Sequence, residues 1–497
     1  MERRNFLKTI GITASSIALP QFDFFKNGAS RNPNIVFILA DDLGYGELGC
    51  YGQEKIKTPN IDKLAAQGTR FTQHYSGSAI CAPSRCSLLT GKHTGYCYIR
   101  DNDEMPERGD VWRDPRLEGQ RPLLADTVTI AKILKEAGYK TAAIGKWGLG
   151  GPGSSGEPNK QGFDYWYGYL CQRVAHNYYP THLWRNNKKE ILEGNEYFFA
   201  HQKLPDEKDA YDQGSCQKYK GKQYSMDLFV KEAINFIQTN KKDPFFLYLA
   251  FTVPHAAIQV PDDSLKEYME LFPETPYKGE KGYLPHPAPR AAYAAMITRM
   301  DREVGRVMSL IEELGIGNDT LVIFSSDNGP TFNGGVDTEF FKSAEPFRGL
   351  KATLYEGGIR VPMIARWPGK IESGRVSNHI SAFWDFLPTF TELLGIKTPQ
   401  DIDGISMLPV FLGRVEKQKK HEYLYWEYNG SQAVRLADWK ALRNSDDKKI
   451  ELFDLRRDIS EKYNISAENP KIVSLVLQIM EKGRVESELF PLNKNKK

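Results

Sequence analysis

Short continuous runs of apolar residues alternate along this chain with longer stretches in which apolar residues recur at helical spacing. The continuous runs are rich in β-branched and aromatic residues, which is typical of strands buried on both faces of a sheet. They lie at residues 34–40, 140–144, 245–252, 321–325 and 359–365. Helical spacing predicts helices over residues 58–66, 123–137, 226–238 and 291–314. This alternation predicts an α/β fold with a mainly parallel central sheet flanked by helices.

The pattern changes in two regions. A loop rich in glycine, proline and serine covers residues 148–162, and we expect the polar stretch from there to about residue 224 to be irregular. Beyond residue 395, short extended pieces precede a final helix. The pieces lie at 422–428, 432–436 and 439–443, and the helix covers 470–483. We therefore expect a main α/β domain over 31–395 and a smaller antiparallel α+β subdomain over 396–497.

Residues 1–30 have features of an export signal. Twin arginines in Arg3-Arg4-Asn5-Phe6-Leu7-Lys8 precede a weakly apolar stretch that is too short to span a bilayer as a mature helix. They resemble a Tat signal, but Glu2 stands where Ser or Thr is usual and no clean cleavage site follows. We expect export through Tat or Sec machinery to the periplasm or cell surface of a bacterium, without a stable membrane span. The alternative is an ordinary basic N-terminal tail.

Composition excludes several classes of protein. A chain of 497 residues with 40% apolar and 12% aromatic residues is typical of a soluble globular protein. Its formal charge of +3 leaves no electrostatic footprint for nucleic acid or an anionic membrane. The six cysteines are too few to staple a scaffold and lack the C-x-x-C spacing of zinc sites. They lie at positions 50, 81, 86, 97, 171 and 216.

The run from Cys81 to Arg85, with the sequence C-A-P-S-R, is the most informative segment. Pro83 fits the first position of a helix that ends near Gly91, which would place Cys81 just before the helix. The free N–H groups and the dipole at such a terminus favour a sulfate or phosphate oxygen. Arg85 adds a guanidinium suited to oxyanions. The alternative is a buried cysteine before an ordinary helix.

Two predicted strand ends bring acidic groups to one edge of the sheet. Asp41 and Asp42 follow the first buried strand, and Asp327 and Asn328 follow the strand at 321–325. Ligands bind at the carboxyl ends of such strands. Three clustered carboxylates repel one another unless a cation lies among them, and a set of oxygen donors favours Ca²⁺ or Mg²⁺. The alternative is that these residues only cap helices or form Asx turns.

Three further strand ends supply basic groups. Lys146 and His255 follow predicted strands, and Lys351 precedes one. A single lysine at a strand end is usually a solvated charge, and a single histidine usually has ordinary hydrogen-bond partners. These three residues, however, would all lie on the same edge of the sheet. A divalent cation, Arg85 and the two lysines carry five positive charges, and the three aspartates carry three negative charges. The formal surplus is therefore two positive charges before any histidine takes up a proton. Such a site suits an anionic ester.

These ordered motifs, over roughly residues 33–395, resemble those of the type I, formylglycine-dependent sulfatases of the alkaline phosphatase-like superfamily. The resemblance implies that Cys81 is oxidised to formylglycine by a formylglycine-generating or anaerobic sulfatase-maturating enzyme. The hydrate of this aldehyde would attack the sulfur of a sulfate ester. The family's divalent cation, usually Ca²⁺, would be bound by Asp41, Asp42, Asp327, Asn328 and the modified Cys81.

The resemblance also implies roles for the basic residues and for one carboxylate. Arg85 would hydrogen-bond to the modified residue, and Lys146 and Lys351 would contact the sulfate. Asp327 would help to deprotonate the attacking hydroxyl, and His255 would protonate the departing alcohol.

The chain departs from the family pattern at Gly148. Many relatives have Gly-Lys-Trp-His-Leu-Gly, whereas this chain has glycine in place of the histidine. His176 and His182 are the candidates to replace that histidine, and the alternative is that both are ordinary loop residues. Eight aromatic residues over 163–184, together with Arg173, could bind a sugar, or the rings could simply belong to the core.

We therefore predict a hydrolase that releases sulfate from a sulfated glycan. One alternative is a phosphate or phosphonate ester hydrolase on the same scaffold. The other is a glycan-binding protein without turnover, which the missing histidine would favour.

Overall fold

A large mixed sheet forms the centre of the structure, and its middle strands are the apolar runs described above. The computed structural model describes residues 32–103, 118–198, 200–201, 203–445 and 449–492. Within these residues, ten strands form the large sheet. In spatial order they are β11 (Arg375–Ser377), β2 (Thr69–Phe71), β10 (Met363–Arg366), β9 (Thr320–Ser326), β1 (Asn34–Asp41), β8 (Phe245–Pro254), β4 (Lys140–Lys146), β5 (Tyr165–Tyr169), β6 (His182–Arg185) and β7 (Lys188–Ile191). Neighbouring strands from β9 to β5 are parallel, which confirms the predicted fold class.

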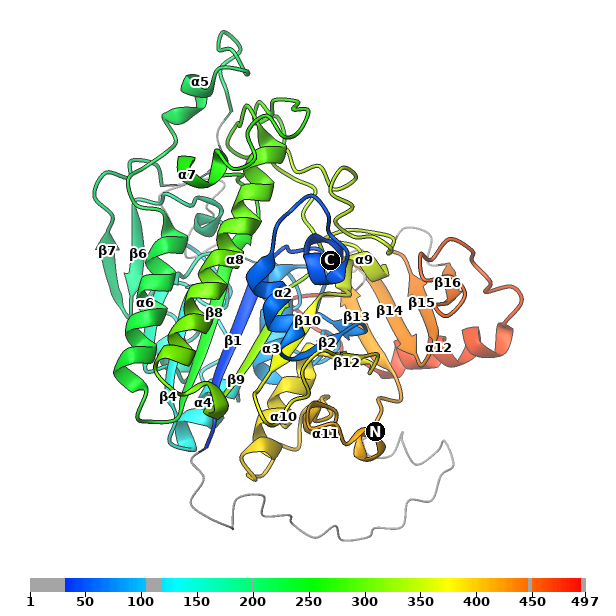
Figure 1. Ribbon diagram of the computed structural model, residues 1–497. Coiled ribbons are helices and arrows are strands. Elements are labelled where there is room, and N and C mark those ends of the chain that lie inside the picture. Colours follow the sequence, from blue (N-terminus) through cyan, green and yellow to red (C-terminus); the bar gives the residue numbers. More distant parts are fainter. Residues whose placement is uncertain (1–31, 104–117, 199, 202, 446–448, 493–497) are drawn as a thin grey trace. The chain divides into compact units, whose positions relative to one another are not determined.

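Helices cover both faces of this sheet (Figure 1). In the described residues they are α2 (Pro59–Ala66), α3 (Cys81–Thr90), α4 (Ile130–Glu136), α5 (Gln213–Gln217), α6 (Ser225–Asn240), α7 (Asp262–Leu265), α8 (Pro289–Glu313), α9 (Glu356–Ile359), α10 (Phe386–Leu393), α11 (Leu408–Phe411) and α12 (Pro470–Lys482). Val36 and Ile38 of β1 join a buried cluster with α6 and α8. Phe37 and Leu39 join another with α3, α4 and α10. Because both faces are buried, β1 is apolar at almost every position.

The stretch predicted to be irregular, up to residue 224, instead contributes three strands to the sheet. β5 pairs in parallel with β4, and the antiparallel hairpin of β6 and β7 continues the sheet to its edge. β7 is largely exposed. An exposed edge strand needs no continuous apolar run, so the hydrophobic pattern did not reveal it.

Two predicted elements are shorter in the structure. The helix predicted over 123–137 begins only after Thr129, because the Thr129 side chain accepts a backbone hydrogen bond and caps α4. The strand predicted over 359–365 begins after Pro362, since Ile359 still belongs to α9. This strand, β10, runs antiparallel to β9. The sheet is therefore mixed on that side.

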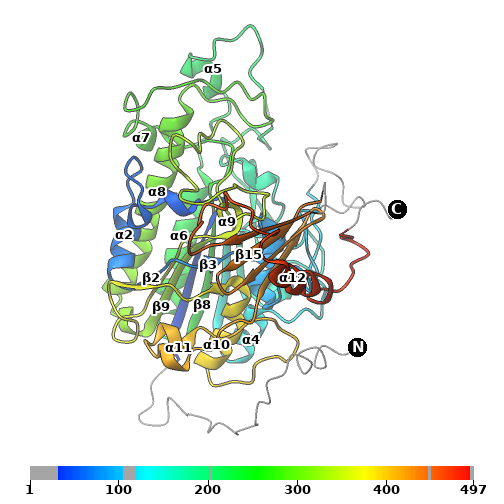
Figure 2. The ribbon, with the colours of Figure 1, turned by 90° about the vertical axis from the view of Figure 1, so that its right-hand side faces the viewer.

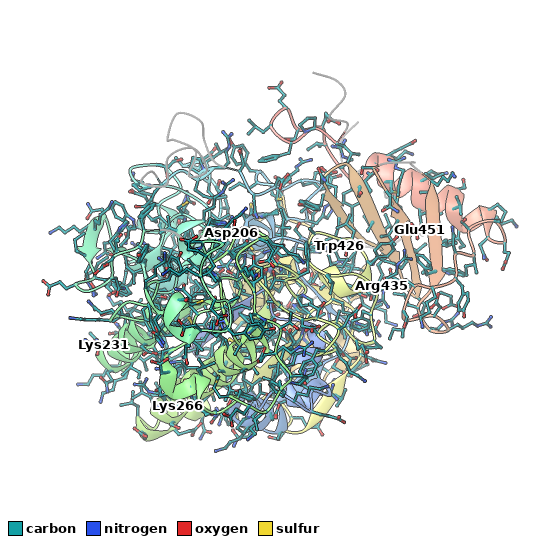
Figure 3. All side chains as sticks on the ribbon, turned by 90° about the horizontal axis from the view of Figure 1, so that it is seen from above. Asp206, Lys231, Lys266, Trp426, Arg435 and Glu451 are labelled. Atoms are coloured by element: carbon teal, nitrogen blue, oxygen red, sulfur yellow. The ribbon has the colours of Figure 1, made fainter. Side chains whose placement is uncertain are left out.

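A second sheet of four antiparallel strands follows, and it faces the viewer in Figure 2. Its strands are β13 (Leu424–Tyr428), β14 (Ser431–Leu436), β15 (Trp439–Arg443) and β16 (Ile450–Asp454), and a separate pair joins β3 (His74–Tyr75) to β12 (Ser381–Ala382). The sequence predicted the first three strands and α12, which packs on the sheet, but not β16. Trp426, labelled in Figure 3, donates a 2.9 Å hydrogen bond to the carbonyl of Ser76, the residue after β3, and so joins this sheet to the pair of β3 and β12. The domain boundary at residues 395 and 396 stays a prediction.

Three predictions concern the chain outside its folded core. The export signal predicted at 1–30 lies outside the described residues. Among the helices that the structure describes, none has the length and apolar character needed to cross a bilayer. All six cysteines are described, and each is a free thiol.

Candidate active site

Side chains from distant parts of the sequence meet at the carboxyl edge of the central strands. β1 ends at Asp41, β4 ends at Lys146, and His255 directly follows β8. Asp327 and Asn328 follow β9. Because neighbouring parallel strands end on the same edge, these residues become neighbours, as the sequence predicted.

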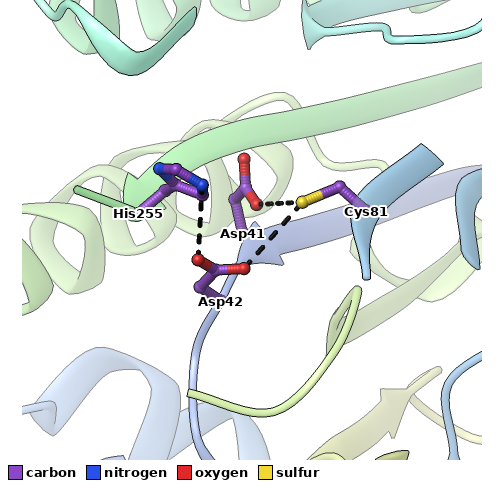
Figure 4. A group of neighbouring side chains, drawn as sticks. All are labelled: Asp41, Asp42, Cys81 and His255. Atoms are coloured by element: carbon purple, nitrogen blue, oxygen red, sulfur yellow. Dashed lines mark hydrogen bonds and ion pairs between the residues drawn. The ribbon is translucent and has the colours of Figure 1, made fainter. Parts of the chain in front are cut away.

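Helix α3 brings Cys81 to this edge. Cys81 is the first residue of the helix, which therefore starts two residues before Pro83, the predicted start. Gly91 ends the helix in the left-handed conformation, with φ of 69°. The Cys81 side chain is only 1% exposed, and its Sγ lies 3.3 Å from Asp41 Oδ1 and 3.9 Å from Asp42 Oδ1 (Figure 4). The positive end of the α3 dipole lies beside this sulfur, a setting that favours an anion.

Two lysines complete the surroundings of Cys81. Lys146 Nζ lies 3.5 Å from the Cys81 Sγ and 2.5 Å from Asp41 Oδ2. Lys351 Nζ lies 3.6 Å from the same sulfur and 2.7 Å from Asp42 Oδ2. Burial alone would lower the pKa of both lysines, but the adjacent carboxylates outweigh it and raise both values. Both lysines are therefore cations at neutral pH.

Arg85 joins two of the converging segments. Its Nε and Nη2 donate to Asp327 Oδ2 at 3.0 and 2.9 Å, and its Nη1 donates to the Lys146 carbonyl at 2.6 Å. The side chain is fully buried. Burial opposes its charge, but Asp327 more than compensates and raises the pKa of the guanidinium. Arg85 thus fixes the end of β4 relative to the end of β9.

The aspartates differ in their affinity for a proton. Burial, reinforced by the charge of Asp41, raises the pKa of Asp327 to about 7. Burial also opposes the ionisation of Asp41, but four surrounding basic groups, led by Lys146, hold the pKa of its carboxyl well below the usual range. Near neutral pH, Asp41 is a carboxylate and Asp327 can exchange a proton.

Asp42 and Asn328 complete a set of oxygen donors. Asp42 N donates to Asp327 Oδ1 at 3.1 Å, and Asn328 Nδ2 donates to Asp42 Oδ1 at 2.7 Å. Asp42 has a φ of 63°, a left-handed conformation that Asp tolerates better than most residues. Asn328 Oδ1 is buried and has no hydrogen-bond partner among the described residues. Three carboxylates and this amide oxygen fit a hard divalent cation such as Ca²⁺ or Mg²⁺.

A sulfur and a nitrogen lie close to the same donors. One ligand atom from each of Asp41, Asp42, Cys81 and His255 lies within 4.8 Å of the others. The side chain at position 81 is therefore within reach of an ion held by the oxygen donors. The predicted role of the modified Cys81 as a ligand of the cation requires this proximity.

His255 lies on the other side of the carboxylates. Its Nε2 is 3.4 Å from Asp42 Oδ2, and its Nδ1 contacts the Ala256 carbonyl. Burial, followed by the charge of Lys351, lowers the pKa of His255 to about 4. The His176 ring stacks on His255, with centroids 4.1 Å apart and planes inclined by 12°. This stack fixes the orientation of the His255 ring.

Among the three residues predicted to bind substrate, His176 belongs to the group around His255. Its Nδ1 lies 3.3 Å from His201 Nε2. Burial lowers the pKa of His201 to about 4, and the charge of Arg173 adds to this effect. His182 instead lies on β6, where its Nε2 is 2.7 Å from Glu118 Oε1. The substrate-binding roles of all three residues stay predictions.

The aromatic residues between 163 and 184 belong mostly to the core. Trp166, Tyr167 and Tyr178 are at most 1% exposed. A buried ring offers no face to a sugar, so core packing accounts for these side chains. The Tyr178 hydroxyl also donates to the His255 carbonyl at 2.8 Å, which supports the backbone of the site.

The sequence did not single out Tyr283 and His201, whose rings lie next to the stacked pair of His176 and His255. The Tyr283 ring lies 6.0 Å from the His255 ring and 4.8 Å from the His201 ring, between centroids. Neither Tyr283 nor His201 belongs to a motif or follows a predicted strand. Only the packing of distant loops reveals them.

The fold and this site define an enzyme for anionic esters, and comparisons with known proteins identify its family. The Sulfatase family matches residues 33–396, and the family of N-sulphoglucosamine sulphohydrolase C-terminal regions matches residues 350–486. The chain belongs to the sulfatase family, which confirms the resemblance. It is a sulfuric ester hydrolase.

Individual relatives match over nearly their whole lengths. N-acetylgalactosamine-6-sulfatase from Mus musculus is 31% identical, over 96% of this chain and 85% of that protein. N-acetylgalactosamine-6-O-sulfatase from Bacteroides thetaiotaomicron is 28% identical, over 91% of this chain and 93% of that protein. The crystal structure of Ps i-CgsB in complex with k-i-k-neocarrahexaose is 29% identical, with a TM-score of 0.72, over 91% of this chain and 93% of that one.

Proposed function

We propose that this sulfatase releases inorganic sulfate from a sulfated carbohydrate. The observation that carries the proposal is the buried Cys81, which lies between Lys146 and Lys351 at the N-terminal end of α3. The carbohydrate is supported by the names of two relatives, which act on N-acetylgalactosamine 6-sulfate, and by the oligosaccharide in a similar crystal structure.

The basic side chains would hold the sulfate group. The two lysine ammonium groups lie 3.5 and 3.6 Å from the Cys81 Sγ, so oxygens on a sulfur placed beside this position would meet both. The helix dipole favours the same anion. Negative charge that develops on the sulfate oxygens would therefore be met by donors already in place.

The unmodified thiol is a poor nucleophile in this position. Burial, followed by the charge of Asp41, raises the pKa of Cys81 well above its ordinary value, so little thiolate forms. We therefore propose that residue 81 is converted to formylglycine. The hydrate of this aldehyde would supply the hydroxyl that attacks sulfur. Since Cys81 is 1% exposed in the fold, a maturation enzyme would have to act on it before the chain folds.

Two side chains are placed to move protons. Asp327, with a pKa of about 7, would accept the proton of the attacking hydroxyl. His255 lies across the carboxylates from Cys81 and would give the departing alcohol oxygen a proton. Because the pKa of His255 is about 4 in the empty site, the imidazole would have to take up this proton when the anionic ester binds, since a nearby negative charge favours the protonated ring. The sulfuryl group would then be bonded to the hydrate oxygen of residue 81. Deprotonation of the second hydroxyl of the hydrate would expel inorganic sulfate and regenerate the aldehyde, to which water adds again. The products are sulfate and the free alcohol.

The cation would be held by Asp41, Asp42, Asp327 and Asn328, with residue 81 beside it. When bound, a divalent ion supplies positive charge that offsets the three carboxylates and polarises the reacting oxygens. The buried Asn328 Oδ1, which lacks a partner among the described residues, supports this assignment.

Export to the periplasm or cell surface remains part of the proposal, and its support is the twin-arginine motif at Arg3 and Arg4. Cell fractionation of a bacterium producing the full chain would test it. Replacement of both arginines by lysine should retain the protein in the cytoplasm if Tat exports it. Unchanged export of this variant would point to Sec.

A substrate panel tests the function. The full chain, produced together with a formylglycine-generating enzyme, should release sulfate from at least one of N-acetylgalactosamine 6-sulfate and a sulfated galactan oligosaccharide. Aryl sulfate and aryl phosphate serve as comparisons, and faster phosphate release would favour the phosphoesterase alternative. Binding of the sugars without release would favour a binding protein. Peptide mass spectrometry of position 81 checks the modification, and full activity with an intact thiol would contradict it.

A further inference from the structure

Most side chains of the candidate active site are sealed from solvent. Those that are at most 2% exposed are Asp41, Asp42, Cys81, Arg85, Lys146, His255, Asp327 and Asn328. Lys351 and His176 are more exposed, at 9% and 8%, and Tyr283 is only partly buried. A substrate has to reach Cys81 from solvent, so its approach lies on the side of these three residues.

Tyr283 lies on the loop between α7 and α8 and packs against three histidines. Its ring centroid is 6.0 Å from that of His255, 5.5 Å from that of His176 and 4.8 Å from that of His201. The Tyr283 and His255 rings meet edge to face, at 62° between their planes. Tyr283 is therefore a direct neighbour of the residue that would protonate the departing alcohol.

The loop that carries Tyr283 is held in place by its own hydrogen bonds. The backbones of Tyr277 and His286 exchange two hydrogen bonds, each of 2.9 Å. The Tyr277 hydroxyl also accepts a hydrogen bond from the Lys281 backbone N–H at 3.0 Å. These bonds close the loop on both sides of Tyr283, so the position of its ring beside His255 is fixed before a substrate binds.

The Tyr283 hydroxyl is available to a ligand. It makes no hydrogen bond to any of the described residues, and it is not sealed from solvent. The charges of Lys351 and Asp42 act on this hydroxyl, which therefore lies near them. Burial raises the pKa of Tyr283 to about 12, although the charge of Lys351 opposes the increase. At neutral pH the group is an uncharged O–H donor.

The missing histidine at position 148 opens no second path to Cys81. A Cβ at this position would lie 2.6 Å from Gln172 Cγ, so Gln172 fills the space beside Gly148. Gln172 Nε2 donates to Asn102 Oδ1 at 3.1 Å, and the Ala82 backbone N–H donates to the same oxygen at 3.0 Å. These contacts fix the two amides in place beside α3.

Building on the proposed function, we propose that Tyr283 contacts the sugar that carries the sulfate and is a specificity-determining residue. With the sulfate between Lys146 and Lys351 and the departing oxygen beside His255, the sugar extends toward the more exposed side, where Tyr283 lies. The Tyr283 hydroxyl donates a hydrogen bond to an oxygen of this sugar. A leaving group without an oxygen next to the ester gains nothing from this donor.

The variant Tyr283→Phe tests this role, because it keeps the ring against the histidines and removes only the donor. We measure kcat/KM for the sulfated sugars of the panel and for phenyl sulfate, whose leaving group has no further oxygen. The ratio of the value for a hydrolysed sugar to the value for phenyl sulfate should fall about three- to tenfold, as expected for the loss of one neutral hydrogen bond. A purely structural role would lower both values together.

The controls separate this inference from the proposed function. Tyr211→Phe removes a hydroxyl from a side chain that is 74% exposed and should leave the ratio as it is. An unchanged ratio in Tyr283→Phe, whether both values fall equally or neither falls, would overturn the inference alone. If the unaltered enzyme hydrolyses phenyl sulfate but none of the sugars, the proposed carbohydrate substrate itself is wrong, and with it the role of Tyr283.

Discussion

At the scale of single residues, the site depends on side chains that hold one another in fixed positions. Arg85 donates to Asp327 and to the Lys146 carbonyl, and the Asp42 backbone N–H also donates to Asp327. None of these hydrogen bonds joins residues close in sequence. The geometry of the candidate site is therefore a property of contacts across the sheet edge, and changes to a neighbouring ring should alter it.

Replacement of His176 tests whether stacking positions His255. The variant His176→Phe keeps a ring against His255 but loses the contact with His201, whereas His176→Ala loses both. Since a stacked pair contributes about 0.5–1.5 kcal/mol, we expect the Ala variant to lose roughly two- to tenfold in kcat. The Phe variant should retain most of it. Steady-state kinetics on an aryl sulfate gives kcat for both variants. Equal kcat values in the Ala variant and the unaltered enzyme would contradict a positioning role.

Removal of Asn328 Oδ1 tests the assignment of the cation site. The variant Asn328→Ala loses one oxygen donor, so the Ca²⁺ concentration that gives half-maximal activity should rise at least about tenfold. The thermal midpoint of unfolding, measured with chelator and then with added Ca²⁺, gives a second readout. Added Ca²⁺ should raise the thermal midpoint of the unaltered protein, and it should raise that of the variant by a smaller amount. Equal shifts in both proteins would show that Asn328 does not bind the ion.

At the scale of elements, buried ions connect the four-stranded sheet to α9 and β3. Glu356 of α9 accepts hydrogen bonds from Lys440 of β15 at 2.9 Å and from the Tyr75 hydroxyl of β3 at 2.6 Å. Arg360 lies 3.1 Å from the same carboxylate. α9 directly follows the loop that carries Lys351. This network therefore holds the second sheet against the segment that carries Lys351, one of the proposed sulfate contacts.

Neutralising Glu356 should destabilise this junction strongly. The variant Glu356→Gln leaves the buried Lys440 without its strongest partner, a change that usually costs about 3–5 kcal/mol. Glu451 of β16, which is partly exposed and labelled in Figure 3, provides the matched control. Glu451→Gln should cost less than about 1 kcal/mol. Urea unfolding followed by circular dichroism measures both, and similar losses in the two variants would rule out the proposed role of burial.

At the scale of the whole molecule, the fold buries ionisable groups far from the active site. His74 of β3 is fully buried, and its Nδ1 lies 2.9 Å from Ser381 Oγ of β12. Burial lowers the pKa of His74 to about 3. The unfolded chain takes up a proton near the ordinary histidine pKa of about 6.5, whereas the native protein does not. His74 therefore contributes stability above pH 6.5, which is lost as the pH falls toward 3.

A pH series of unfolding measurements should reveal this contribution. As the pH is lowered from 7 to 4, the free energy of unfolding of the unaltered protein should fall more steeply than that of His74→Gln. The variant has no group at this position that takes up a proton on unfolding. The difference in free energy of unfolding between the two proteins should therefore become smaller as the pH falls. A constant difference across this range would show that His74 is not held neutral. The comparison cancels the effects of other groups that titrate in both proteins.

The amino-acid sequence by itself determined the central strands and the residues at their ends. β1, β8 and β9 are buried on both faces, so their composition alone marks them, and parallel strands necessarily bring Asp41, His255 and Asp327 to one edge. The run after Cys81 also revealed its helix, although not its first residue. These features depend on local composition or on a general property of parallel sheets, and both can be recognised without a structure.

Only the tertiary structure decided the remaining features. The strands β5 to β7 complete a sheet whose edge needs no apolar run, and the stack of His176 on His255 joins residues from separate loops. The contact of Asn102 with Ala82 and the space that Gln172 takes beside Gly148 likewise have no local signal. Their physical cause is the packing of segments distant in sequence, where each position depends on many others at once.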